Sequence, residues 1–225
     1  MKLLLWDIDG TLIDSRGLGG EAMNMAFQKV YKLNTFYPPQ NMAGKTDLEI
    51  LKEYLDSNNF IYSDLQSESK KVFPLYFKYL KNYIRNDKKN IPFVFNGVKE
   101  ILTESKKNKN IIHGLLTGNY KPVAKLKLQF FDLWKYFKIG AFGERTTVRS
   151  YLATVALNEF RKKFKKDPHS VYVIGDTPKD ILVAKEYNLI SVAVATGLFS
   201  IEKLKDYNPD FLISDLTEFP EEILT

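Results

Sequence analysis

The sequence predicts an α/β protein with a parallel sheet core and an inserted all-helical segment. Three observations indicate this class. A short apolar run opens the chain at 3–6, residues from about 16 to 90 show only helical spacing, and from Pro92 onward short apolar runs alternate with helical segments. Alternating strands and helices favour right-handed crossovers, which produce a parallel sheet.

The first predicted strand ends in an acidic turn. The apolar run Leu3 to Trp6 is too short for anything but a buried strand, and Asp7, Asp9 and Gly10 follow it. Residues i and i+2 of an extended chain point to the same side, so the two carboxylates are expected to converge at the carboxyl end of the strand. Open α/β sheets bind their ligands there.

Two carboxylates this close repel each other unless a divalent cation or a shared proton compensates the charge. Gly10 allows the chain to turn sharply behind them. The alternative interpretation is an ordinary Asp-Gly turn in which Thr11 only caps the chain.

The segment from about 16 to 90 is expected to form three or four helices and no strand. Apolar spacing predicts a first helix that ends near Leu33. Thr46 and Glu49 have the spacing of a capping box at the start of a second helix. Ser63 to Gln66 repeats this pattern before a long third helix, which Pro74 either kinks or begins.

From Pro92 onward, strands and helices are expected to alternate. We expect helices near 98–102, at about 121–131 and at about 149–164, then a short helix that ends at residue 184 and another near 201–204. We expect strands at 111–116, 137–142, 171–174, 190–194 and 211–213. His113 is interpreted as a tolerated strand residue and not as a ligand. The first strand joins this sheet, so the helical segment is an insertion between strands one and two.

Polar side chains follow three of these strands: Asp7 and Asp9, then Thr117 and Asn119, then Asp176 and Asp180. The ends of parallel strands lie along one edge of the sheet. Carboxylate and carbonyl oxygens without His or Cys suit Mg²⁺. Asp180 lies one helical turn beyond Asp176, where it either joins the site or only offsets the dipole of a helix start.

Taken together, these residues resemble the motifs of the haloacid dehalogenase superfamily, in its phosphoglycolate phosphatase and β-phosphoglucomutase-like group with a small helical cap. The first motif matches residues 7–11, the second Thr117-Gly118-Asn119, and the fourth residues 175–180. The resemblance covers the whole chain, including the insertion point. It implies a Rossmann-like core.

The third motif departs from the family pattern. The family places a lysine before the helix that precedes the fourth motif, and residues 143–150 contain no lysine. Arg149 stands at the expected position and is able to hold a phosphate bidentately. Arg145 is the competing candidate, and a plain surface arginine is the remaining alternative. We favour Arg149 because it directly precedes the predicted helix.

The resemblance also implies a mechanism. Asp7 is the expected nucleophile and forms an aspartyl-phosphate. Asp9 is the expected general acid and base, for which we expect a pKa raised by crowding and partial burial. The expected metal site comprises Asp7, the main-chain carbonyl of Asp9, Asp176, and Asp180 through hydrogen bonds or a water.

Phosphate binding is expected from Thr117, Gly118 and Asn119, with Arg149 opposite. The helical cap is expected to close over the site and exclude water. In the loop before a cap helix, Lys45 either meets a second anionic group of the substrate or is an ordinary exposed lysine. Thr196 and Gly197 are expected to line the entrance.

The expected domains are a core of residues 1–15 and 92–225 and a helical cap of residues 16–91. The formal charge is +6, but the densest cationic runs, Lys106–Lys109 and Arg161–Lys166, fall near predicted helix ends, where cations complement the dipole. We therefore expect no nucleic acid partner.

The composition excludes other classes of protein. The chain has no cysteine, so it forms no disulfide and no thiolate metal site. No run approaches the ~20 apolar residues of a membrane span. We expect a cytoplasmic monomer or dimer.

The expected function is Mg²⁺-dependent hydrolysis of a small phosphorylated metabolite. One alternative is a phosphomutase of the same family, which passes the phosphoryl group to a sugar. Another is a non-catalytic binding protein on this fold, for example for nucleic acid. The costly pair of Asp7 and Asp9 argues against a pure binding protein.

Overall fold

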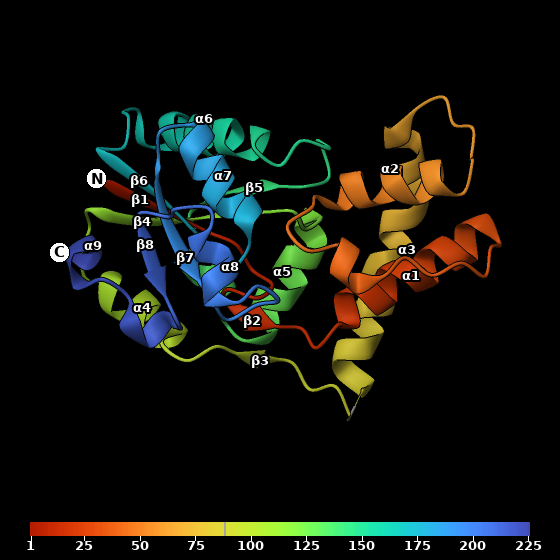
Figure 1. Cartoon of the computed structure of the whole chain (residues 1–225), viewed down its shortest axis with the longest axis horizontal. Coiled ribbons are helices and arrows are strands. Elements are labelled where there is room, and N and C mark those ends of the chain that lie inside the picture. The colour runs from red at the N-terminus through yellow and green to blue at the C-terminus, as the bar shows by residue number, and fades with distance from the viewer. Residues whose placement is uncertain (88) are drawn as a thin grey trace.

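A six-stranded parallel sheet forms the centre of the computed structural model, which describes residues 1–87 and 89–225 (Figure 1). Its strand order is β5-β4-β1-β6-β7-β8. The strands are β1 (Lys2–Trp6), β4 (Ile111–Thr117), β5 (Ile139–Phe142), β6 (Ser170–Gly175), β7 (Ile190–Val194) and β8 (Phe211–Ile213). Because β1 pairs with both β4 and β6, the residues that follow these three strands meet at one edge. The predicted α/β class with a parallel sheet is confirmed.

Helices cover both faces of the sheet. Alternate side chains of β1 explain this arrangement: Leu4 and Trp6 pack with Leu128, whereas Leu3 and Leu5 pack with buried residues on the opposite face. The helices around the sheet are α4 (Val98–Ser105), α5 (Lys121–Phe130), α6 (Tyr151–Phe164), α7 (Pro178–Glu186), α8 (Ile201–Lys205) and α9 (Glu221–Leu224).

Three further helices form a separate layer beyond the carboxyl ends of the strands, on the right of Figure 1. These are α1 (Leu18–Tyr31), α2 (Asp47–Ser57) and α3 (Leu65–Asn86), and we call them the helical layer. They have their own cluster of buried apolar side chains. A two-residue ribbon, β2 (Ile13–Asp14) with β3 (Phe93–Val94), pairs the chain where it leaves and re-enters the sheet region. The domain boundaries expected from the sequence stay a prediction.

The ends of these helices follow local capping chemistry. Thr46 and Glu49 form the predicted capping box of α2. The cap of α3 is Asp64 and not Ser63, since its carboxylate accepts the N–H groups of Gln66 and Ser67 at 3.0 and 2.9 Å. Pro74 lies inside α3 and does not begin it.

His113 is a structural residue, as interpreted from the sequence. Trp6 Nε1 donates to His113 Nδ1 at 2.9 Å, so Nε2 carries the proton and faces Ser105 Oγ at 2.7 Å. Burial lowers the pKa of His113 to about 4, which leaves the ring neutral. The ring therefore links β1, β4 and α4 through hydrogen bonds.

The cationic runs lie where the sequence suggested. Lys106 follows the last residue of α4, and Arg161 to Lys163 form the last turn of α6. Within the described ranges, no helix combines the length and the apolar character needed to cross a bilayer. The cytoplasmic location and the oligomeric state stay predictions.

We predict that His113→Leu lowers the free energy of unfolding by about 1–3 kcal/mol at pH 7, because Trp6 Nε1 loses its buried acceptor. The folded-state pKa of His113 lies below its ordinary value, so the wild type itself loses stability as the pH falls from 6.5 towards 4. The deficit of the variant should therefore shrink over that range. Urea unfolding at several pH values measures it, with exposed His169→Leu as the matched control.

Candidate active site

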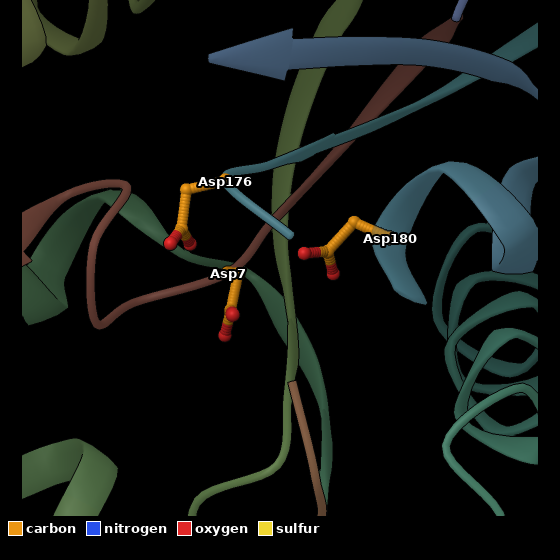
Figure 2. A group of neighbouring side chains, drawn as sticks. All are labelled: Asp7, Asp176 and Asp180. Atoms are coloured by element: carbon orange, nitrogen blue, oxygen red, sulfur yellow. The ribbon is translucent and has the colours of Figure 1, made fainter. Parts of the chain in front are cut away.

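Three buried carboxylates converge at the carboxyl ends of β1 and β6. Asp7, Asp176 and Asp180 each place an oxygen within 4.8 Å of the others. Figure 2 shows where the three side chains come from: Asp7 from the end of β1, Asp176 from the end of β6 and Asp180 from α7. Residues far apart in sequence therefore form one acidic cluster.

Glycines make room for this cluster. Gly10 has a φ of 80°, and a Cβ there, or at Gly197, would collide with the Asp176 carboxylate. Thr11 Oγ1 donates to Asp176 Oδ1 at 3.1 Å. Thr196 Oγ1 donates to the carbonyl of Gly10 at 2.5 Å and ties this loop to the one after β7. Asp176 thus lies between two loops, each of which has a glycine at the point where it contacts the carboxylate.

Arg149 is the cation of the cluster. It lies just before α6, and its Nη2 contacts Asp7 Oδ2 at 2.9 Å and Asp180 Oδ1 at 2.5 Å. Its Nε is buried without a hydrogen-bond partner among the described residues. Arg145, the competing candidate, is exposed. The structure therefore brings Arg149, and not Arg145, to the carboxylates.

The cluster carries more negative charge than Arg149 offsets. Burial raises the pKa of Asp7 to about 6 against the opposing attraction of Arg149, and repulsion from Asp180 adds to the rise. Burial and repulsion from Asp7 and Asp180 raise the pKa of Asp176 well above its ordinary value. Three hard oxygen donors with uncompensated charge fit a divalent cation such as Mg²⁺.

Asp180 combines both roles that the sequence left open. As the third residue of α7, it accepts hydrogen bonds on Oδ2 from Thr177 N and Thr177 Oγ1, at 3.2 and 2.7 Å. Its other oxygen accepts from Arg149. The carboxylate of Asp180 therefore both caps α7 and holds the guanidinium group of Arg149.

The side chain of Asp9 lies outside this cluster. Its Oδ1 accepts from Ser15 Oγ at 2.8 Å, and its Oδ2 accepts from Asn119 Nδ2 at 2.9 Å and Lys127 Nζ at 2.6 Å. The expected raised pKa was wrong. Burial alone would raise the pKa of Asp9, but the Lys127 ammonium and the three hydrogen bonds together hold it below its ordinary value.

The second motif lies beside Asp9. Thr117 is fully buried, and its Oγ1 accepts from the backbone and side-chain N–H groups of Asn119 at 3.3 and 2.8 Å. The carbonyl of Gly118 accepts from Asp47 N, the first residue of α2, at 2.7 Å. A Cβ at Gly118 would collide with the carbonyl of Lys45. The loop before α2 is therefore packed directly on this motif.

Lys45 is not an ordinary exposed lysine. Its Nζ contacts Glu53 Oε2 at 2.5 Å and Tyr37 Oη at 3.2 Å, and the residue lines a cavity of about 360 Å³. Asp7, Arg149 and other residues of the strand ends line the same cavity. Residues of the sheet edge and of the helical layer thus enclose one space, with Gly197 on its lining as expected.

Three polar residues of this region were missed in the sequence: Ser15, Asp47 and Lys127. Lys127 did leave a signal, because it shares the buried face of α5 with Val123 and Ala124. A lysine on such a face requires an anionic partner. Asp47 looked like an ordinary first-turn acid, and Ser15 carries no pattern at all.

We predict that Asp47→Asn makes stability less dependent on pH. Burial raises the pKa of Asp47 to about 7, although the N–H of Tyr120 at 2.6 Å and Lys127 favour the charged form. Ionisation therefore costs the wild type stability as the pH rises from about 4 to 7. Between pH 4 and pH 7, the free energy of unfolding of the variant should therefore rise by roughly 2–4 kcal/mol relative to that of the wild type.

Thermal or urea unfolding from pH 4 to 8 measures this difference. The control is Asp206→Asn, at an exposed position near the end of α8. A stability difference that stays constant with pH would contradict the burial of an ionisable Asp47.

Comparisons with known proteins agree with this geometry. A family model for haloacid dehalogenase-like hydrolases matches residues 4–194. The pyrophosphatase PpaX of Oceanobacillus iheyensis is 25% identical over 223 residues, which cover 97% of this chain and 94% of that protein. A phosphoglycolate phosphatase of Vibrio parahaemolyticus is 24% identical over 226 residues, which cover 98% and 95%.

A solved structure shows the same fold. CbbY of Rhodobacter sphaeroides, determined in complex with phosphate, aligns with a TM-score of 0.73 at 15% sequence identity, covering 96% of this chain and 95% of that one. The family model spans most of the chain, from β1 to the end of β7. The chain therefore belongs to the family of haloacid dehalogenase-like hydrolases, as its motifs predicted.

Proposed function

We propose that this protein is a Mg²⁺-dependent phosphatase that hydrolyses a small phosphorylated metabolite through an aspartyl-phosphate on Asp7. The observation that carries the proposal is the buried cluster of Asp7, Asp176 and Asp180 around Arg149, at the edge of the sheet that faces the cavity. Catalysis of phosphoryl transfer consists mainly of positioning and charge stabilisation, and this cluster provides both.

The phosphatase class itself rests on the family. The chain is a haloacid dehalogenase-like hydrolase, and its relatives are named as phosphatases and pyrophosphatases. One of these relatives is named for pyrophosphate and the other for phosphoglycolate. Their names therefore do not identify one substrate for this chain.

Mg²⁺ fits the residues that are present. Asp7 and Asp176 would hold it together with the main-chain carbonyl of Asp9, and Asp180 would act through hydrogen bonds or a water. The bound cation would offset the repulsion between the carboxylates and the incoming phosphate. Burial is the main cause of the raised pKa values of Asp7 and Asp176, and repulsion among the carboxylates adds to it. A bound cation would relieve that repulsion, which supports the assignment.

In the first step, a carboxylate oxygen of Asp7 attacks phosphorus, and the bond from phosphorus to the leaving oxygen breaks. Asp9 gives its proton to that oxygen, so the product leaves as a neutral hydroxyl compound. Arg149 keeps Asp7 in place and, with Thr117, Gly118 and Asn119, binds the phosphate oxygens. The Nε of Arg149, which is buried and has no hydrogen-bond partner among the described residues, supports such a contact.

In the second step, water attacks the phosphorus of the aspartyl-phosphate and Asp9 takes its proton. The bond between Asp7 and phosphorus breaks, and inorganic phosphate is released. The lowered pKa of Asp9 suits this step, because an ionised carboxylate is the form that accepts a proton. For the first step, repulsion from the phosphate group raises the proton affinity of Asp9 when substrate binds.

The substrate is expected to be small, because the cavity of about 360 Å³ is bounded by the helical layer. Lys45 lies on that side, so we propose that it contacts a second anionic group of the substrate. A phosphomutase on the same site would need a sugar phosphate as acceptor. Release of inorganic phosphate separates the two activities.

We predict that Asp7→Asn lowers kcat by at least about 1,000-fold, because an amide oxygen is a far weaker nucleophile than a carboxylate. Phosphate release is measured with p-nitrophenyl phosphate, 2-phosphoglycolate and inorganic pyrophosphate, with Mg²⁺ and with chelator. The control Asp167→Asn, at an exposed residue, should match wild type. Wild-type activity in Asp7→Asn would eliminate the nucleophile assignment, and no release by folded wild type would eliminate the phosphatase.

We also predict that Mg²⁺ binding releases protons near pH 6. The pKa of Asp7 is about 6 and that of Asp176 is raised, so part of the cluster is protonated and must ionise to hold the cation. Affinity for Mg²⁺ should therefore increase from pH 5 to 7. Calorimetry in buffers of different ionisation heat counts the protons, and a pH-independent affinity would contradict a site built from these carboxylates.

A further inference from the structure

A buried lysine outside the acidic cluster contacts the residue assigned as general acid and base. Lys127 lies in the second turn of α5 and is 3% exposed. Its Nζ lies 2.6 Å from Asp9 Oδ2 and 2.7 Å from Asn119 Oδ1. None of the family motifs quoted above contains this residue.

The contacts of Lys127 fix the orientation of two other groups. An ammonium group only donates hydrogen bonds, so the atom of Asn119 that faces it must be the oxygen. The amide nitrogen of Asn119 is then left to donate to Asp9 Oδ2 at 2.9 Å and Thr117 Oγ1 at 2.8 Å. Lys127 therefore orients Asp9 both directly and through Asn119.

Packing does not explain the presence of this ammonium. Removing a lysine charge from water is unfavourable unless a partner compensates it, and the other buried residues of this face of α5 are apolar. The backbone of the helical layer makes room for the charge, because a Cβ at Gly19 of α1 would lie 3.3 Å from Lys127 Nζ. The ammonium group thus faces Gly19 on one side, and the oxygens of Asp9 and Asn119 accept its hydrogen bonds. These surroundings are suited to a buried positive charge.

We propose that Lys127 is a positioning residue, which holds the Asp9 carboxyl group and the Asn119 amide in the arrangement that serves proton transfer to the leaving group. This inference rests on the proposed phosphatase function. It assigns Lys127 no contact with the transferred phosphoryl group, which Arg149 and the second motif bind.

The proposal has a specific kinetic consequence. The value of kcat/KM reports the steps up to the aspartyl-phosphate, in which Asp9 protonates the leaving oxygen. A p-nitrophenolate leaves readily without a proton, whereas the more basic phenolate depends on one. Disordering Asp9 should therefore harm phenyl phosphate more than p-nitrophenyl phosphate, although the two substrates have nearly the same shape.

The experiment compares these two substrates with Lys127→Met, after thermal unfolding has shown that the variant is folded. We expect kcat/KM for phenyl phosphate to fall by about 100-fold and that for p-nitrophenyl phosphate by about 10-fold or less. Lys127→Gln, which keeps an N–H donor, should show a smaller selective loss, and it serves for the same comparison if the Met variant does not fold. Lys125→Met, on the exposed side of the same helix, should match wild type.

A second comparison tests whether Lys127 acts through Asp9. In an Asp9→Asn background, adding Lys127→Met should change kcat/KM for phenyl phosphate by less than about 3-fold, because the group that it positions is already lost. Equal losses on both substrates, or a full further loss in the double variant, would overturn the role proposed for Lys127 while leaving the phosphatase in place. A folded wild type that hydrolyses no phosphoester would overturn both proposals.

Discussion

The structure depends on the burial of several carboxylates at the end of its central strand. Asp7, Asp176 and Asp180 meet there because β1 lies beside β6, and α7 begins just beyond β6. Buried carboxylates placed this close repel one another unless cations compensate their charge. Arg149 supplies one positive charge, but burial, together with repulsion among the carboxylates, still raises the pKa values of Asp7 and Asp176. The position of these side chains thus creates a cluster of oxygen donors that could hold a metal ion.

The two carboxylates of the first motif have different surroundings. Asp7 faces Arg149 and the acidic cluster, whereas Asp9 faces Lys127 and Asn119. At Asp7, burial is the largest effect and raises the pKa. At Asp9, the charge of Lys127 and the hydrogen bonds from Lys127, Asn119 and Ser15 together outweigh burial and lower the pKa. Two carboxylates that lie two positions apart in the chain therefore have pKa values shifted in opposite directions.

The helical layer completes the site by direct contact with its loops. The backbone N–H of Leu48 donates to Gly143, and that of Asp47 donates to Gly118. Neither glycine has room for a Cβ, because the carbonyl of Lys45 lies against Gly118, and the carbonyl of Gly118 and the side chain of Thr46 lie against Gly143. The same loop brings Lys45 to the cavity, so the segment of the helical layer that lines the cavity is also the one anchored on the second motif.

The sequence by itself determined the class of the fold, the family, and the acidic residues at the strand ends, because each of these depends on local patterns. Apolar runs predict strands, and polar residues directly after several parallel strands fall at one edge of the sheet. Only the tertiary structure decided which groups compensate these charges. Arg149 reaches Asp7 across 142 positions of the chain, Lys127 reaches Asp9 from the apolar face of a helix, and Asp47 docks on the second motif from the insertion. Such pairings depend on distances between elements that no local pattern encodes, and for this reason the direction of the Asp9 pKa shift was expected wrongly.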